Sequence, residues 1–243
     1  MIFTIVYFIL STILTIICAL FAITFGLITR PFSKKLSILI VHSTAKFWGR
    51  TILKMAFISF NIEGKENYNY KKTYILTINH QSAFDIFCCF YIFKGLYAFV
   101  SKDTYGKVPF VGFGMKLSNY IFVKRGTVGA VKSIDDMEDR LKNNTSIVIY
   151  PEGTRSKDGE IRMPKRGILK IAERCNDIDV LPVVLYGTKD IMVARGFRVN
   201  PFRKIRVRIL PSFNFNKIEG DENTKLKYWY DIINKNYNEL KNN

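Results

Sequence analysis

The sequence has no charged side chain among its first 29 residues and no acidic residue among its first 60. An uncharged run of that length exceeds the ~18 apolar residues that mark a membrane-spanning candidate. No basic segment precedes the run, and no small-residue cleavage site follows a short apolar core, so a cleaved signal peptide is a poor fit. The pattern predicts a helix embedded in a membrane.

Cysteine and histidine are scarce, which bears on metal sites and disulfides. The four cysteines include no C-x-x-C pair, so neither a zinc site nor a disulfide framework is supported, and reduced thiols in apolar surroundings are expected. There is no P-loop, and Gly112-Phe113-Gly114 fails the dinucleotide pattern because residue 117 is leucine. We therefore predict neither a metal nor a bound cofactor.

The balance of charge points to an anionic partner. The 243 residues carry a formal charge of +17, and 48% of them are hydrophobic, enough for one sizeable domain with an appendage. Nucleic acid and anionic lipid both fit the charge. The uncharged start favours lipid, so we expect no nucleic-acid partner; a non-enzymatic basic protein that binds membranes or nucleic acid is the alternative reading.

Residues 36–60 form a second helical pattern with a basic stripe. Lys46, Arg50 and Lys54 follow one another at four-residue spacing, which places them on one helical face. Bulky apolar side chains surround them, so we expect a basic amphipathic helix lying in the membrane surface: Phe47, Trp48, Ile52, Leu53 and Phe57.

Two regions follow from this: a membrane-associated helical segment at 1–60 and a larger domain at 61–243, which the motifs described below predict to be a catalytic domain. Arg30, Lys34 and Lys35 directly follow the uncharged run, and positive charge favours the cytoplasmic side, so the catalytic domain is expected on the cytoplasmic face of a membrane. The alternative is that residues 1–60 form two buried core helices.

The remainder alternates between strand and helix patterns, which favours an α/β fold with a central, mostly parallel or mixed sheet flanked by helices. Strands are predicted at 72–78, 97–100, 120–123, 146–150, 180–186 and 205–210, and helices at 86–93, 127–143, 165–175 and 224–240.

The first predicted strand is followed by Asn79-His80-Gln81-Ser82-Ala83-Phe84-Asp85. Neutral imidazole can accept a proton near pH 7, and a carboxylate can fix its tautomer. Residues five apart on one helix point about 140° away from each other, so a strand-to-helix turn must fold His80 back onto Asp85. Ser82 is expected to cap that helix, with Asp85 in its first turn. A serine-hydrolase reading of Ser82 lacks the G-x-S-x-G elbow.

Two other strands end in polar groups. Lys124-Arg125-Gly126 follows one, and an arginine can hold a phosphate bidentately, although a solvated basic loop is the competing reading. The segment from Glu152 through Gly153 and Thr154 to Arg155 follows another. Open α/β sheets place ligands at such carboxyl ends.

Four ordered segments resemble the motifs of the glycerolipid acyltransferases, and most closely those of the 1-acylglycerol-3-phosphate (lysophosphatidate) acyltransferases. They are NHQSAFD (79–85), SKDTYGKVPFVGFGMKLSNYIFVKR (101–125), YPEGTRSKDGE (150–160) and VLPVVLYGT (180–188). The resemblance implies a histidine–aspartate base pair, His80 and Asp85, in an H-x-x-x-x-D motif.

The resemblance also implies substrate contacts, from Lys102, Lys124, Arg125, Glu152, Gly153, Thr154 and Arg155. The family often has an acidic or polar residue where this chain has Lys124.

The implied reaction is transfer of an acyl chain from an acyl thioester, on coenzyme A or acyl carrier protein, to the free hydroxyl of 1-acylglycerol-3-phosphate. The product would be phosphatidic acid, made for phospholipid biosynthesis without an acyl-enzyme. An acyltransferase that remodels another lysolipid is the alternative enzyme. The implied partners are lysophospholipid, acyl thioester, an anionic membrane surface and, for one donor, acyl carrier protein.

Overall fold

The computed structural model describes residues 1–124 and 127–242 of the chain. Seven strands form one sheet in the order β1-β7-β6-β2-β5-β3-β4. The strands are β1 (Ser59–Glu63), β2 (Ile75–Ile78), β3 (Tyr97–Lys102), β4 (Ile121–Val123), β5 (Ser146–Ile149), β6 (Val180–Tyr186) and β7 (Lys204–Ile209).

Five neighbouring strands, from β6 to β4, run parallel, and β7 pairs antiparallel with β6. The sheet is therefore mixed, as expected. All six predicted strands are present; β1, which pairs parallel with β7, was not predicted. The domain boundary expected at residue 60 falls inside β1.

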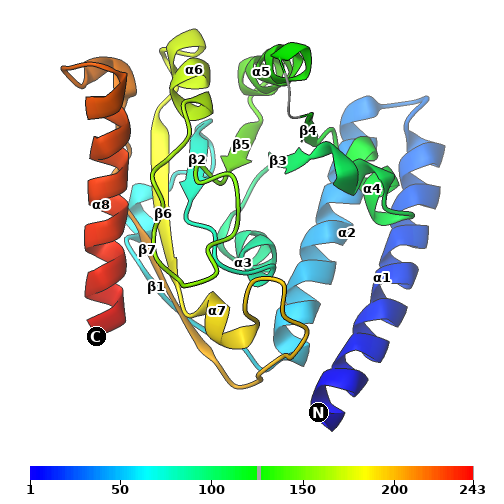
Figure 1. Ribbon diagram of the computed structural model, residues 1–243. Helices are drawn as coiled ribbons and strands as arrows, with labels where there is room; N and C mark the ends of the chain where they lie inside the picture. The colour runs from blue at the N-terminus through cyan, green and yellow to red at the C-terminus, as the bar shows by residue number, and fades with distance from the viewer. Residues whose placement is uncertain (125–126, 243) are drawn as a thin grey trace.

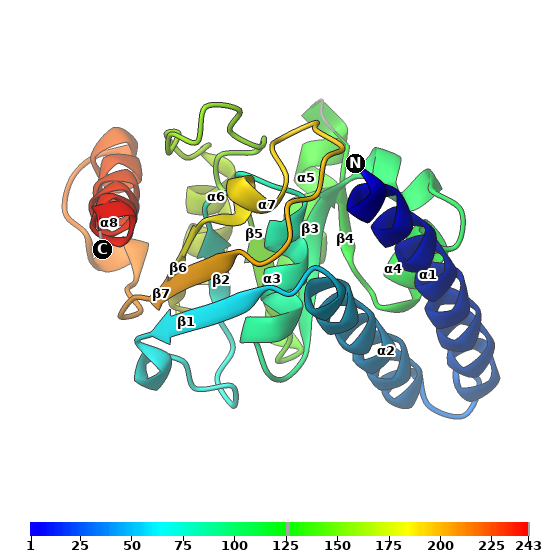
Figure 2. The same ribbon diagram turned by 90° about the horizontal axis from the view of Figure 1, so that it is seen from below.

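Helices cover both faces of the sheet (Figures 1 and 2). The helices after residue 60 are α3 (Phe84–Ile92), α4 (Val111–Leu117), α5 (Thr127–Lys142), α6 (Gly167–Arg174), α7 (Thr188–Ile191) and α8 (Glu222–Asn242), with short 3-10 turns at Lys65–Asn67, Asp103–Lys107 and Phe215–Lys217. Parallel strands require crossover connections, and α3, α5 and α6 supply three of them. Figure 2 shows α3 on one side of the sheet, with α5 and α6 on the other.

Two long helices, α1 (Ile2–Thr29) and α2 (Lys34–Met55), form an antiparallel hairpin beside this layer structure. The Tyr7 hydroxyl donates to the Ile52 carbonyl (3.3 Å), and the Ser37 hydroxyl donates to the Gly26 carbonyl (2.7 Å). A Cβ on Gly26 would lie 2.7 Å from the Val41 side chain, so glycine permits the close approach of the two helices.

The outer side of α1 is apolar and exposed. Within the described residues, α1 is the one helix long and apolar enough to cross a membrane, judged by length and composition. These properties are compatible with membrane association.

Part of the apolar side of α2 faces protein, whereas Phe47 on the same helix is 61% exposed, and the expected position of α2 in the membrane surface stays a prediction. Ile52 and Leu53 are buried, and Trp48 donates to the Thr15 hydroxyl (2.9 Å) while its ring packs edge-on against Phe87. These contacts arise because α3 packs against α2, a long-range contact that helical periodicity does not encode.

Candidate active site

The site begins where β2 leaves the sheet. The Asn79 side chain continues the strand pairing: its amide donates to the Leu185 carbonyl (2.9 Å) and its oxygen accepts from the Leu185 N–H (2.8 Å). Asn79 is 1% exposed, and this buried pair of hydrogen bonds fixes the point at which the chain turns toward α3.

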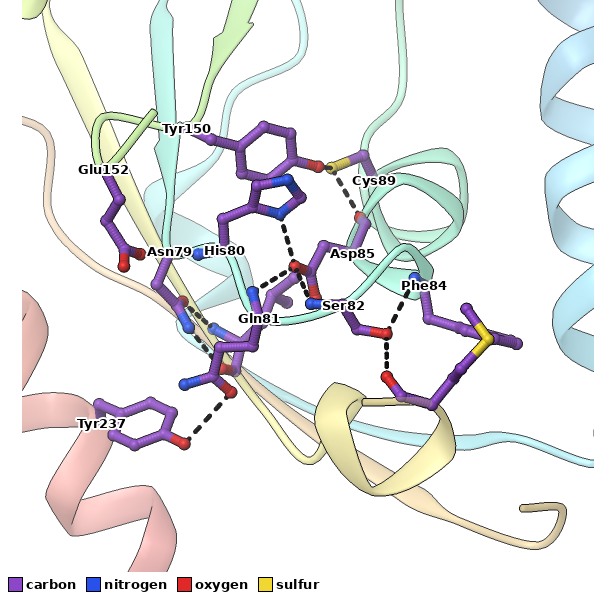
Figure 3. Close-up of polar contacts among 12 residues, drawn as sticks. Asn79, His80, Gln81, Ser82, Phe84, Asp85, Cys89, Tyr150, Glu152 and Tyr237 are labelled. Atoms are coloured by element: carbon purple, nitrogen blue, oxygen red, sulfur yellow. Dashed lines mark hydrogen bonds and ion pairs between the residues drawn. The ribbon is translucent and has the colours of Figure 1, made fainter. Parts of the chain in front are cut away.

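The turn folds His80 back onto Asp85, which confirms the predicted geometry (Figure 3). His80 Nδ1 lies 2.8 Å from Asp85 Oδ2. A carboxylate accepts only, so Nδ1 carries the proton and the lone pair is on Nε2. The imidazole is 15% exposed and the carboxylate 1% exposed. The arrangement places a proton acceptor at the surface and its charge partner inside.

Asp85 also holds the turn itself. The same Oδ2 accepts the backbone N–H groups of Gln81 (2.7 Å) and Ser82 (2.9 Å). Asp85 lies in the first turn of α3, as predicted, where the helix dipole favours negative charge. Burial of this carboxylate is therefore offset by three hydrogen bonds and the helix terminus.

Ser82 is not the N-cap that its position predicted. The N-cap is Ala83; the Ser82 hydroxyl accepts weakly from Phe84 N–H (3.3 Å) and donates to the Met192 carbonyl (2.7 Å). The side chain is drawn out of the cap position by this bond to the chain beyond α7. A buried hydroxyl committed to a carbonyl is not placed as a nucleophile.

Tyr150, at the end of β5, fixes the plane of the imidazole. The two rings stack with centroids 4.0 Å apart and an interplanar angle of 21°. Tyr150 is held in turn by Cys89, whose Sγ lies 3.4 Å from the phenol oxygen and 3.2 Å from the Asp85 carbonyl. Sequence reasoning assigned Tyr150 no role; the signal was an aromatic residue at the end of a strand, directly before the polar segment.

The segment after β5 clamps the backbone of His80 from both sides. Glu152 Oε1 accepts the His80 N–H (2.7 Å), and the Ser156 N–H donates to the His80 carbonyl (2.8 Å). Glu152 Oε2 accepts the Arg162 N–H (3.1 Å). Both carboxylate oxygens of Glu152 are thus bonded to backbone, and a contact between Glu152 and substrate stays a prediction.

Burial makes Glu152 a weaker acid than an exposed glutamate. The side chain is 3% exposed, and desolvation raises its pKa to about 7, against the lowering effect of its two backbone hydrogen bonds. This carboxyl group therefore titrates near neutral pH beside the histidine.

The other predicted contacts in this segment are more open. Thr154 is exposed and Arg155 is half-buried, and Arg155 makes no ion pair within residues 1–124 and 127–242. Gly153 has a φ of 73°, and a Cβ there would lie 2.9 Å from the Lys165 side chain, so the turn favours glycine.

The predicted cations lie along the same edge of the sheet. Lys102 ends β3 and Lys124 follows β4, and both are exposed. Because these strands run parallel to β2, their carboxyl ends share an edge with His80, about 10 and about 14 Å from β2 at the usual strand spacing. Arg125 lies outside the described residues.

A residue from the far end of the chain also reaches this region. Gln81 donates to the Gly159 carbonyl (2.7 Å) and accepts from the Tyr237 hydroxyl (3.2 Å). Tyr237 lies on α8, where sequence reasoning found nothing diagnostic, because the contact spans 156 residues.

The second histidine is a core residue. His42 is 2% exposed, its ring meets Tyr97 edge-on at 4.6 Å, and burial lowers its pKa to about 3. Among the residues that the structure describes, no cluster of His, Cys, Asp or Glu could hold a metal ion, and the four cysteines are free and buried.

Known proteins resemble this chain in sequence and in fold. A family model described as Acyltransferase matches residues 59–186. A chloroplastic 1-acyl-sn-glycerol-3-phosphate acyltransferase of Arabidopsis thaliana is 32% identical over 170 residues, 69% of this chain and 46% of that protein. A 1-acyl-sn-glycerol-3-phosphate acyltransferase of Borreliella burgdorferi is 27% identical over 72% of this chain and 69% of its own length.

Saccharomyces cerevisiae has a relative of the same printed name, 32% identical over 61% of this chain and 50% of its own length. The matched part thus spans about half of the plant and yeast relatives. The crystal structure of the 1-acyl-sn-glycerophosphate (LPA) acyltransferase PlsC from Thermotoga maritima superposes with a TM-score of 0.83 over 99% of this chain and 95% of that one. At 22% identity, this likeness shows a shared fold.

Proposed function

Because this chain belongs to the acyltransferase family, we propose that it transfers an acyl chain from an acyl thioester to the free hydroxyl of 1-acylglycerol-3-phosphate. The products are phosphatidic acid and a free thiol. The observation that carries the proposal is the 2.8 Å bond from His80 Nδ1 to Asp85 Oδ2, which leaves Nε2 with a lone pair at the surface. The printed names of the relatives support the choice of acceptor.

In this mechanism His80 is the general base. Nε2 takes the proton of the acceptor hydroxyl as its oxygen attacks the thioester carbonyl. Asp85 stabilises the imidazolium that forms. Collapse of the tetrahedral intermediate breaks the carbon–sulfur bond, and the proton on Nε2 passes to the departing thiolate. The lysolipid supplies the nucleophile, so no acyl-enzyme forms and no cofactor is required.

The cations along the edge of the sheet are proposed to hold the phosphate. Arg155, Lys102 and Lys124, together with Arg125, provide positive charge near the base, and an oriented acceptor reacts faster than a free one. Thr154 and Gly153 line the same turn as Arg155. The donor thioester is proposed to be carried by coenzyme A or by acyl carrier protein.

Membrane association supplies the substrate. The exposed apolar side of α1 and the net charge of +17 suit an anionic leaflet. The basic residues Arg30, Lys34 and Lys35 after α1 support a cytoplasmic location of the catalytic domain. We expect the chain to sediment with membranes and to resist carbonate extraction.

The test is an acyltransfer assay on the purified chain. A panel of lysolipid acceptors is incubated with one acyl-CoA and with one acyl carrier protein thioester, and the diacyl products are quantified. We expect 1-acylglycerol-3-phosphate to be the best acceptor, and His80→Ala to lower turnover by about 10²–10⁴. A better turnover with a lysolipid that lacks the terminal phosphate would identify a remodelling enzyme instead. Near-normal turnover by His80→Ala would refute the mechanism.

A further inference from the structure

The loop of residues 192–203, which joins α7 to β7, lies at the same end of the molecule as the start of α1 (Figures 1 and 2). The Thr4 hydroxyl donates to the Val199 carbonyl (3.4 Å) and accepts from the Val199 N–H (3.3 Å). The Phe202 N–H donates to the Ala56 carbonyl (3.1 Å). The Met192 carbonyl accepts from Ser82 (2.7 Å). The 192–203 loop is therefore tied to α1 and to the end of α2 at one side and to the active-site turn at the other.

The loop presents large apolar side chains to the outside. Val193 is 57% exposed, Phe197 64% and Phe202 72%. The Phe202 ring stacks on that of Phe57, itself 56% exposed, with centroids 4.6 Å apart. The stacked rings of Phe57 and Phe202 thus form an exposed apolar patch, and such patches mark sites of interaction.

The backbone holds these aromatic residues in an unfavourable conformation. Phe57 has a φ of 55° and Phe202 a φ of 58°, values that bulky residues rarely adopt. Strain of this kind persists where the surrounding structure imposes it, and it concentrates at functional positions.

Exposed cations alternate with the aromatic residues. Arg195, Arg198 and Arg203 are exposed and make no ion pair within the described chain. The nearest carboxylate in the sequence, Asp190, is exposed on α7. Aromatic rings interleaved with arginines match the boundary between lipid headgroups and acyl chains, where the guanidinium groups meet phosphate and the rings meet hydrocarbon.

The patch also continues an apolar surface. Ile2 is 81% exposed and Ile5 54% exposed, and both lie within two residues of Thr4, which bonds the loop at Val199. One lipid surface can therefore contact the first turns of α1 and the 192–203 loop together.

We propose that the 192–203 loop is a second lipid-docking surface, which enters the headgroup region of an anionic leaflet beside the start of α1. Docking holds the carboxyl edge of the sheet, with His80, against the source of lipid. Binding of the loop to lipid does not depend on the proposed acyl transfer; its effect on catalysis rests on that proposed function.

Quenching by brominated lipids tests the docking directly. The chain is reconstituted in vesicles of phosphatidylglycerol and phosphatidylcholine, with bromine near the headgroup end of the acyl chains. We expect strong quenching in Phe197→Trp and none in the matched Tyr228→Trp, since Tyr228 is 41% exposed on α8, away from α1. The signal of Trp48 and Trp229 in the parent is subtracted.

Equal quenching at the two positions would overturn the proposal. So would an unquenched, buried tryptophan at 197, because a second copy of the chain would then cover the patch.

A charge variant tests the catalytic consequence. Arg195→Asn with Arg198→Gln is compared with Lys235→Gln with Lys241→Gln on α8, which removes the same charge from exposed positions. Asparagine suits the left-handed φ of 66° at Arg195.

With long-chain lysophosphatidate in vesicles, we expect the arginine variant to lose up to about thirtyfold in kcat/KM, from about 1 kcal/mol per cation at an anionic surface. A monomeric short-chain acceptor should react normally. Equal losses on both acceptors would overturn the docking role. If the parent chain transfers no acyl group, the proposed function fails while the quenching result still decides the docking.

Discussion

Replacement of Asp85 by asparagine tests the link between geometry and chemistry. Asp85 Oδ2 accepts from His80, Gln81 and Ser82 at 2.7–2.9 Å, while Oδ1 is buried without a hydrogen-bond partner in the described residues. The asparagine oxygen can take the place of Oδ2 and keep the turn. Its amide group then occupies the Oδ1 position, where the described residues supply no acceptor.

The substitution should affect folding stability less than it affects the rate. A buried amide without an acceptor costs about 1–3 kcal/mol of folding stability, or about 3–9 °C in Tm for a chain of this size. The missing charge acts on the rate, because the imidazolium loses its partner in the transition state. The same change in a Ser-His-Asp triad lowers kcat by about 10⁴, and we expect a fall in kcat of about 10³–10⁴ with KM altered less than about threefold.

The assay measures kcat and KM for 1-acylglycerol-3-phosphate at saturating thioester, with thermal unfolding of the same samples. Asp190→Asn is the matched control, since it removes an exposed carboxylate at the same end of the sheet, and it should behave as the parent. A folded Asp85→Asn enzyme with kcat within tenfold of the parent would refute the role of the pair. A large rise in KM at unchanged kcat would make Asp85 a substrate-binding residue instead.

Two further predictions concern the groups around His80. The folded-state pKa of Glu152, about 7, lies above its ordinary value of 4.5, so the folded chain retains a proton that the unfolded chain releases between these pH values. The free energy of unfolding of the parent, taken relative to that of Glu152→Gln from thermal unfolding, should fall by about 3 kcal/mol from pH 4.5 to 7. If this difference between parent and variant does not change with pH, the argument from burial is wrong. Tyr150→Phe keeps the ring stack on His80 and should retain kcat. Tyr150→Leu should lower kcat about 2- to 10-fold, because an aromatic pair contributes about 0.5–1.5 kcal/mol. Equal kcat in the two variants would show that the stack makes no contribution to the rate.

The active-site turn was predictable because its determinants are local. Five-residue spacing excludes a contact between His80 and Asp85 on one helix, and an apolar strand pattern precedes the pair. A strand-to-helix turn was therefore required, and the structure has one. The cap was mispredicted because Ser82 bonds Met192, a partner 110 residues away that no local rule supplies.

The other features that the sequence did not predict also depend on contacts between residues far apart in the chain. Strand β1 is short and half-exposed, and its pairing with β7 joins segments about 145 residues apart. The orientation of α2 depends on α3, and the bond from Tyr237 to Gln81 depends on where α8 docks. Trp229 places α8 through a bond from its indole N–H to the Thr77 hydroxyl in β2 (2.9 Å). Periodicity indicates that a residue is buried and leaves open what buries it.

The motif segments act on a single imidazole from different directions. Asp85 fixes Nδ1, Tyr150 covers one face of the ring, and Glu152 and Ser156 hold the backbone N–H and carbonyl of His80. These constraints come from α3 and from the chain after β5, so thermal motion of one element is opposed by the other. Nε2 is left as the polar atom of the ring without a bond in the described structure, and in the proposed mechanism the acceptor hydroxyl approaches it from outside. Because His80 follows the carboxyl end of β2, we expect that approach to run along the edge where the exposed cations lie, so that a phosphate on the acceptor would orient the reacting hydroxyl.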